Sequence, residues 1–263
     1  TTEIYTRALH DALPIFDYLK GKREKFIITT VDSKIVIAGS DRRGTIYGIY
    51  ELSRQLGVSP WYWWADAPIA KHSEAYMKKG TYKEKVIIPQ WLQNIELCGE
   101  DRDATIITYD DHANVVFPPT GKGMTTFRTY TLKVEANDIT LRNLTIENNA
   151  ARLGQAVALH TEGDRLLFVN CRFLGNQDTV YTGMPRTRML FHDCYIEGTT
   201  DFIFGPATAW FEHCTIHSKV NSYITAASTP KDVDYGYVFS NCTVTAADSV
   251  IINPQGMIDW SGM

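Results

Sequence analysis

A short motif recurs five times in the second half of the chain, and it limits the possible fold more than any other feature. It consists of a polar residue, Cys or Leu, another polar residue and an apolar residue, as in NLTI, NCRF, DCYI, HCTI and NCTV. The steps in sequence number from Leu144 through Cys171, Cys194 and Cys214 to Cys242 are 27, 23, 20 and 28. Repeats of this length, with strand-like units between Gly, Asn and Asp turns, are typical of stacked coils. We therefore predict an all-β fold, a right-handed parallel β-helix.

Stacking would align the four cysteines in an inward-facing ladder about 4.8 Å per step. We interpret them as small apolar packing residues. Disulfides are the alternative, although parallel side chains on stacked strands are poorly oriented for bridging. A β-sandwich is the alternative fold, but it would show more hairpin turns and a clearer in–out alternation.

Two acidic residues have the same period as the coils. The interval between Asp178 in GNQDTVYTG and Asp201 in GTTDFIFG equals the interval from Cys171 to Cys194. Gln155 in GQAVAL precedes Asp178 by the same interval, although its coil is the longer one that runs from Leu144 to Cys171. If the insertion in that coil falls between positions 147 and 154, Gln155 is also in phase. The period thus predicts neighbouring carboxylates on one face, with Gln177 and Gln155 beside them.

This arrangement supplies the parts needed for acyl transfer. Because two close carboxylates do not ionise together easily, one can remain a proton donor while the other acts as a nucleophile. Glutamine amides can donate hydrogen bonds to a developing oxyanion. The alternative is that these residues are stacked turn residues that satisfy backbone groups, and the spacing alone does not decide between the two.

Four segments, GTYKEKVIIP, GQAVAL, GNQDTVYTG and GTTDFIFG, resemble in order the motif series of pectin methylesterases. The resemblance extends from about residue 80 to 250. This family consists of right-handed parallel β-helix enzymes, so the resemblance implies a carbohydrate esterase that removes methyl esters from the galacturonate units of pectin. It implies no metal and no organic cofactor.

The resemblance also implies a role for each matching residue. Asp201 would attack the ester carbonyl, and Asp178 would protonate the departing methanol and then activate water. Gln177, helped by Gln155, would stabilise the oxyanion. Phe202 would line a sugar subsite, and Tyr181 could stack on a sugar ring or simply cover the solenoid surface.

One family motif is not found. A Leu-Gly-Arg-Pro-Trp segment, whose Arg would bond the nucleophilic carboxylate, is expected soon after TAADSV, but no arginine follows Arg188. A charge-assisted bond of this kind lowers the pKa of an acid and fixes its orientation. We therefore expect a C-terminally truncated β-helix with a weakened nucleophile, and a monomer apart from association at the open sheet edge.

The region before residue 80 has a different character. Residues 1–15 resemble the translation of a sequencing adapter, and we expect them to be an artefactual leader. Residues 16–79 are predicted to be a small α+β fragment, with a hairpin from KFIITTV and KIVIAG and a helix from Gly44 to Leu56 capped by Asp41. This part resembles an incomplete N-terminal region of the xylan alpha-glucuronidase family. The β-helix would occupy residues 80–263, and the join could be an assembly chimera.

Composition excludes several other classes. A net charge of −4 and a pI near 6.0 do not favour binding to nucleic acid or to an anionic membrane. Five cysteines without a CxxC pair do not indicate zinc. The prediction is thus a pectinesterase whose partner is methyl-esterified pectin, located outside the cell or in the periplasm. The alternatives are an inactive solenoid that binds polyuronide and a β-helix glycosidase.

Overall fold

The chain divides into two compact units, Thr1–His72 and Ser73–Met263. The computed structural model describes residues 17–31, 34–55, 74–248 and 250. The predicted leader at residues 1–15 lies outside this range. Each unit is described separately below.

The first unit contains the predicted hairpin and helix. Strands β1 (Phe26–Val31) and β2 (Lys34–Gly39) pair antiparallel over their whole length. Helix α2 (Arg42–Gln55) follows, and the Asp41 carboxylate accepts the Gly44 N–H at 2.8 Å. Asp41 is therefore the N-cap, as the sequence predicts, because a carboxylate there satisfies a helix N–H that has no intrahelical partner.

Helix α2 packs on the hairpin through its glycines. A Cβ added at Gly48 would lie 2.5 Å from the Ile37 side chain, so only glycine allows this close approach. Ile46 and Ile49 are instead 38% and 49% exposed. The apolar spacing thus predicted the helix correctly, but these two side chains are not part of a buried face.

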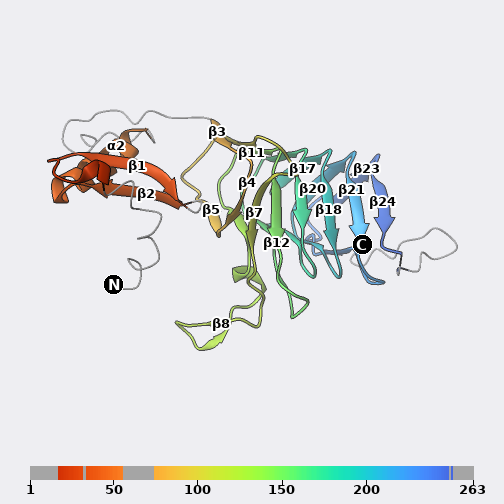
Figure 1. Cartoon of the computed structure of the whole chain (residues 1–263). Coiled ribbons are helices and arrows are strands. Elements are labelled where there is room, and N and C mark those ends of the chain that lie inside the picture. Colours follow the sequence, from red (N-terminus) through yellow and green to blue (C-terminus); the bar gives the residue numbers. More distant parts are fainter. Residues whose placement is uncertain (1–16, 32–33, 56–73, 249, 251–263) are drawn as a thin grey trace. The chain divides into compact units, whose positions relative to one another are not determined.

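The second unit is the predicted right-handed parallel β-helix. Successive strands of a coil join three different sheets in turn, and each strand pairs in parallel with the equivalent strand of the next coil, as the ladder in Figure 1 shows. The first sheet contains β5 (Val86–Ile88), β10 (Leu132–Val134), β13 (Leu159–Thr161), β16 (Val180–Thr182), β19 (Ile203–Gly205) and β22 (Thr225–Ala227).

The other two sheets have seven strands each. The second contains β3 (Glu74–Met77), β6 (Ile95–Gly99), β11 (Ile139–Arg142), β14 (Leu166–Val169), β17 (Arg188–His192), β20 (Thr208–Glu212) and β23 (Tyr237–Ser240). The third contains β4 (Gly80–Lys83), β7 (Thr105–Tyr109), β12 (Thr145–Asn148), β15 (Arg172–Leu174), β18 (Tyr195–Gly198), β21 (Thr215–Ser218) and β24 (Thr243–Ala246).

The β-helix includes more of the chain than the sequence predicts. Strand β3 pairs with β6 from Glu74↔Glu96 to Met77↔Gly99. The first coil therefore includes residues 74–77, and the predicted start at residue 80 is too late. The pattern of short strands separated by turn residues becomes visible in the sequence only from Gly80. Strand β3 precedes this glycine, so the pattern does not reveal it.

One turn conformation explains the five-fold motif. The residue before each Leu or Cys of the motif has φ between 50° and 56°; these residues are Asn143, Asn170, Asp193, His213 and Asn241. Asn, Asp and His tolerate this left-handed region better than most residues. The turn directs the next side chain inward, which is why an apolar residue, Leu or Cys, follows.

The inward side chains form two ladders. The thiol of each of the four motif cysteines donates to a carbonyl of the preceding coil, as Cys194 Sγ does to Phe168 O at 3.4 Å. Beside them the rings of Phe168, Phe191, Phe211 and Phe239 stack at centroid distances of 4.5, 4.7 and 4.6 Å. The stacked rings and thiols lie in a core that also contains buried Leu, Ile, Val and Ala side chains from the three sheets.

All five cysteines are free thiols, in agreement with the packing interpretation. We expect Cys171, Cys194 and Cys214 to resist alkylation in the folded protein because they are at most 2% exposed. All five should react in denaturant without any reductant, as mass spectrometry of differentially labelled peptides would show. Thiols that need a reductant before they react would indicate disulfides instead.

A hairpin projects from the stack between β7 and β10. It consists of β8 (Val116–Phe117) and β9 (Lys122–Gly123), and a short 3-10 helix (Thr126–Arg128) follows it (Figure 1). The buried side chain of Asn148 fixes the base of this excursion, because its amide donates to the carbonyls of Asp111, Thr129 and Val157. The loop thereby carries Phe127 to the outer surface of the first sheet.

Candidate active site

Asp178 and Asp201 occupy the same backbone position in neighbouring coils. Val180 of β16 pairs with Ile203 of β19, so the residues two places before each strand are equivalent. Asp178 N–H donates to Thr200 O at 3.1 Å, which continues this register up to the acids. The predicted phase is therefore correct, and the two Cα atoms are about one strand spacing apart, roughly 4.8 Å.

The backbone at both acids is left-handed, with φ of 66° at Asp178 and 50° at Asp201. Each acid lies three residues after a glycine in a tight turn. A Cβ at Gly175 would lie 2.7 Å from Thr179 Oγ1, and one at Gly198 would lie 2.1 Å from Phe202 Cβ. The repeated G-x-x-D pattern therefore has a steric cause: the residue after the aspartate packs over the glycine.

Burial makes the two carboxyl groups unequal. Asp178 is only 8% exposed, and its burial raises the pKa of its carboxyl to about 7, with the negative charge of Asp201 adding to the effect. Asp201 is half-buried, and burial raises the pKa of its carboxyl as well. Asp178 thus remains protonated up to near neutral pH, while the less buried Asp201 ionises more readily.

Neither carboxylate performs the usual work of a turn residue. Turn aspartates elsewhere in the protein bond the backbone: Asp101 accepts the Asp103 N–H, and Asp164 accepts the Arg188 N–H. Within residues 17–31, 34–55, 74–248 and 250, the side chains of Asp178 and Asp201 have no hydrogen-bond or ion-pair partner. This favours a chemical role over the stacked-turn alternative, since a buried, unpaired carboxyl group is costly.

The two glutamines lie next to each other in neighbouring coils. Ala156 N–H donates to Gln177 O at 3.0 Å, so Gln155 lies beside Gln177. The difference in residue number between paired positions is here one less than the difference between Asp178 and Asp201. The cause is the extra chain between β12 and β13, which advances the residue numbers of that coil relative to the next coil. The prediction that Gln155 lies opposite Asp178 is therefore wrong by one position. Neither side-chain amide has a partner among the described residues, so both can bind a ligand.

An aromatic surface lies beside the acids on the first sheet. Tyr181 and Phe204 pair in register, with ring centroids 4.8 Å apart. The rings of Phe127 and His160 lie 4.9 and 4.8 Å from Tyr181. Phe127 is 50% exposed, so part of this surface is open to solvent.

The placement of Phe202 contradicts its predicted role in a sugar subsite. Its side chain is fully buried in the core and packs over Gly198. The left-handed turn at Asp201 breaks the strand alternation, so Phe202 and Ile203 both point inward and Phe204 points outward. Aligning DTVY with DFIF shows the same result, because Phe204 corresponds to Tyr181 and Phe202 corresponds to Thr179.

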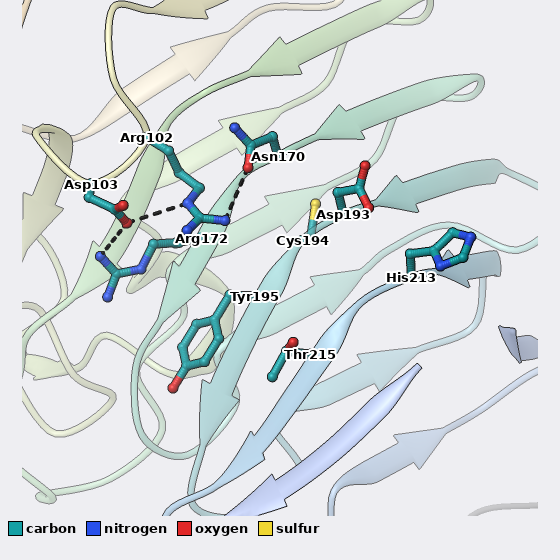
Figure 2. A pocket seen from close by; sticks show the side chains of 9 residues that line it. All are labelled: Arg102, Asp103, Asn170, Arg172, Asp193, Cys194, Tyr195, His213 and Thr215. Carbon is teal, nitrogen blue, oxygen red and sulfur yellow. Dashed lines mark hydrogen bonds and ion pairs between the residues drawn. The ribbon is translucent and has the colours of Figure 1, made fainter. Parts of the chain in front are cut away.

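A separate surface hollow lies on the third sheet (Figure 2). Its lining includes Arg102 and Arg172 but neither Asp178 nor Asp201. Both arginines bond Asp103, and Arg102 also donates to Asn170 Oδ1 at 3.0 Å. These guanidinium groups are therefore engaged locally and are not partners of the two acids.

The pectinesterase family profile matches residues 65–262. The chain belongs to the pectinesterase family. It is 38% identical over 174 residues to Pectinesterase 31 of Arabidopsis thaliana, a match that covers 64% of this chain and 54% of that protein. Pectin methylesterase PemA from Erwinia chrysanthemi has a TM-score of 0.63 and 31% identity, covering 70% of this chain and 61% of that one.

Another pectin methylesterase structure, solved in complex with a hexasaccharide, has a TM-score of 0.63 and 32% identity, covering 70% of this chain and 61% of that one. The chain spans about half the length of its Arabidopsis relative and about three fifths of the two solved chains. These similarities place the β-helix unit, with its two acids, in the pectinesterase family. Among the described residues, no helix has the length and hydropathy needed to cross a bilayer.

Proposed function

We propose that this pectinesterase-family chain hydrolyses the methyl esters of galacturonate units in pectin, with Asp201 as the nucleophile. The observation that carries the proposal is the pair of unpartnered carboxyl groups at one backbone position in adjacent coils. Burial raises the pKa of the more buried group, Asp178, to about 7. One group is thus suited to donate a proton and the other to attack.

In the first half of the reaction, a carboxylate oxygen of Asp201 attacks the ester carbonyl carbon. The carbonyl electrons move to oxygen, and the amides of Gln177 and Gln155 stabilise the oxyanion by hydrogen bonds. When the tetrahedral intermediate collapses, the methoxy group leaves with the proton of Asp178 as methanol. The sugar carboxyl is then joined to Asp201 as an acyl-enzyme.

In the second half, the ionised Asp178 accepts a proton from water, and the oxygen of that water attacks the acyl-enzyme. Asp201 leaves as a carboxylate, the galacturonate acid is released, and Asp178 has regained its proton. The balance is one ester and one water consumed for one acid and one methanol. The reaction requires Asp178 to be protonated at the start and Asp201 to be ionised.

We propose that the exposed aromatic surface binds the sugar chain. Tyr181 is half-buried with Phe127 and Phe204 against it, so its position is fixed before a ligand arrives. Rigid aromatic rings beside free amides are suited to sugar faces and ester groups. The substrate is a cell-wall polymer, so the proposed place of action is outside the cell or in the periplasm.

We also propose that Asp201, as the described residues surround it, is a weaker nucleophile than a carboxylate bonded by a cation. Burial raises the pKa of Asp201, and no cation among the described residues acts in the opposite direction. An acid without a charge-assisted bond is also less well oriented.

The test is methanol release from methylated polygalacturonate, with Gln177→Ala as the informative variant. We expect this variant to lower kcat by roughly 10²-fold with little change in KM, because the amide acts on the transition-state oxyanion. Gln93→Ala is a matched control, since Gln93 is exposed on the loop before β6. No methanol from the unaltered protein, with pectin binding retained, would support the binding-solenoid alternative instead.

A further inference from the structure

Lys219 makes contacts that an ordinary surface lysine does not make. Its ammonium group donates to Gly175 O at 2.9 Å and contacts Glu197 Oε1 at 3.1 Å. Its own backbone N–H donates to Gly198 O at 2.8 Å. The three partners belong to the two preceding coils, so one residue links three coils.

Two of the groups that Lys219 contacts, the carbonyls of Gly175 and Gly198, belong to the candidate active site. Gly175 and Gly198 are the glycines of the two G-x-x-D turns, which present Asp178 and Asp201. Gly175 is the first residue of the turn that carries Gln177 and Asp178. Lys219 therefore holds the beginning of that turn.

The opposite end of the same turn is also held. Thr179, directly after Asp178, has one hydroxyl proton within reach of two carbonyls, Asn176 O at 3.1 Å and Glu197 O at 2.9 Å. Glu197 is thus bonded through its backbone by Thr179 and through its side chain by Lys219. The four residues from Gly175 to Asp178 are fixed at both ends against the next coil.

The carboxylate that anchors Lys219 is itself fixed. Tyr195 donates its hydroxyl to Glu197 Oε2 at 3.0 Å, and burial beside Glu197 raises the pKa of Tyr195 to about 12. Tyr195 therefore remains a neutral donor at any pH of interest. Lys219 and Glu197 are only 27% and 21% exposed in their side chains, so the contact is better shielded than most surface pairs.

We infer that Lys219 is a positioning residue, which fixes the Gly175–Asp178 turn so that Gln177 and Asp178 are held against Asp201. It touches neither the acids nor the place where substrate would lie, so its action is through the turn. The inference rests on the proposed esterase function for its effect on rate, but the effect on the turn itself does not require that function.

The experiment compares Lys219→Met with Lys219→Arg, and with Lys231→Met as the matched control. Lys231 is exposed, and among the described residues it has no hydrogen-bond or ion-pair partner. Each protein is titrated by carbon NMR of its aspartate carboxyl groups, and kcat and KM are measured on methylated polygalacturonate. The titration needs no substrate, so it remains informative even if the unaltered protein releases no methanol.

The direction in which the pKa of Asp178 changes decides between loss of charge and loss of positioning. Simple loss of a positive charge would raise the pKa of Asp178, because a cation favours the carboxylate. Loss of positioning lowers it from about 7, because water enters and Asp201 moves away. We expect Lys219→Met to lower it by roughly half a unit or more and to reduce kcat roughly tenfold to a hundredfold at similar KM.

Lys219→Arg should restore most of both properties, since its guanidinium can bond a carbonyl and a carboxylate together. An unchanged or raised pKa of Asp178 in folded Lys219→Met would overturn the inference. If that variant does not fold, Lys219→Gln replaces it, because it removes the same positive charge and loss of that charge alone would again raise the pKa of Asp178. A fall in the Asp178 pKa is again expected, and its absence would again overturn the inference.

Discussion

Replacing Asp201 with Asn is expected to abolish methanol release, lowering kcat by roughly 10⁴-fold or more. The amide cannot attack an ester carbonyl, so no acyl-enzyme forms. Asn accepts the left-handed backbone at this position, where φ is 50°, as readily as Asp. The fold should therefore be retained, and the loss should be in the chemical step.

The matched control for this variant is Asp193→Asn. Asp193 has a similar φ of 54° and also lies in a turn of the β-helix, but its side chain is 54% exposed and pairs only with His192 among the described residues. It should keep the full rate. Binding of methylated pectin to Asp201→Asn should persist, because the aromatic surface and the glutamines are unchanged. A residual rate within tenfold of the original would remove Asp201 from the mechanism.

Replacing Asp178 with Asn is expected to lower activity but to raise stability at neutral and alkaline pH. The carboxyl of Asp178 has a pKa of about 7 in the folded protein, against 3.8 for an ordinary aspartate. The unfolded chain therefore releases this proton at lower pH than the folded chain does. Stability contributed by the group is complete below pH 4, decreases as the pH rises from 4 to 7, and is constant above that.

Asp178→Asn removes this pH-dependent loss because the amide does not ionise. The variant should match the original protein near pH 4 and be more stable at pH 8, by an amount on the order of 4 kcal/mol in the free energy of unfolding. Urea denaturation at pH 4, 5, 6, 7 and 8 measures the difference. Equal stability at pH 8 would mean that the Asp178 carboxyl is not desolvated.

The same variant should lose roughly 10²–10⁴-fold in kcat, because no proton donor remains for the methoxy group. In the unaltered protein kcat should fall as the pH rises through about 7, when Asp178 loses the proton it must donate. The alkaline limb of activity and the decline of stability thus have one cause. Asp193→Asn should change neither profile.

The coil repeat predicted the fold because its cause is local. Each coil needs one left-handed turn residue followed by a small inward side chain, and both are visible as residue types. The Asp178–Asp201 phase was predictable for the same reason, since the coil between them has the same length at its Cys positions and at its acids.

The errors occurred where coils differ in length or where alternation breaks. The position of Gln155 depends on where the extra residues of its coil lie, and spacing alone does not give that. Phe202 was misplaced because a left-handed residue precedes it and changes the direction of the strand. Phe127 lies beside Tyr181 at the end of a loop, and Lys219 contacts the Gly175 carbonyl from two coils away, so no sequence interval connects them with the acids.

The left-handed turn shared by Asp178 and Asp201 has a consequence for how the site can be altered. The separation of the two acids is a main-chain distance, set by the hydrogen-bonded register of β16 and β19. Substitutions of surrounding side chains can change the depth, hydration or proton affinity of either carboxyl group, but they leave the β16–β19 register unchanged. In a parallel β-helix, single substitutions therefore adjust the properties of individual side chains, whereas the backbone hydrogen bonds between strands set the spacing of neighbouring coils.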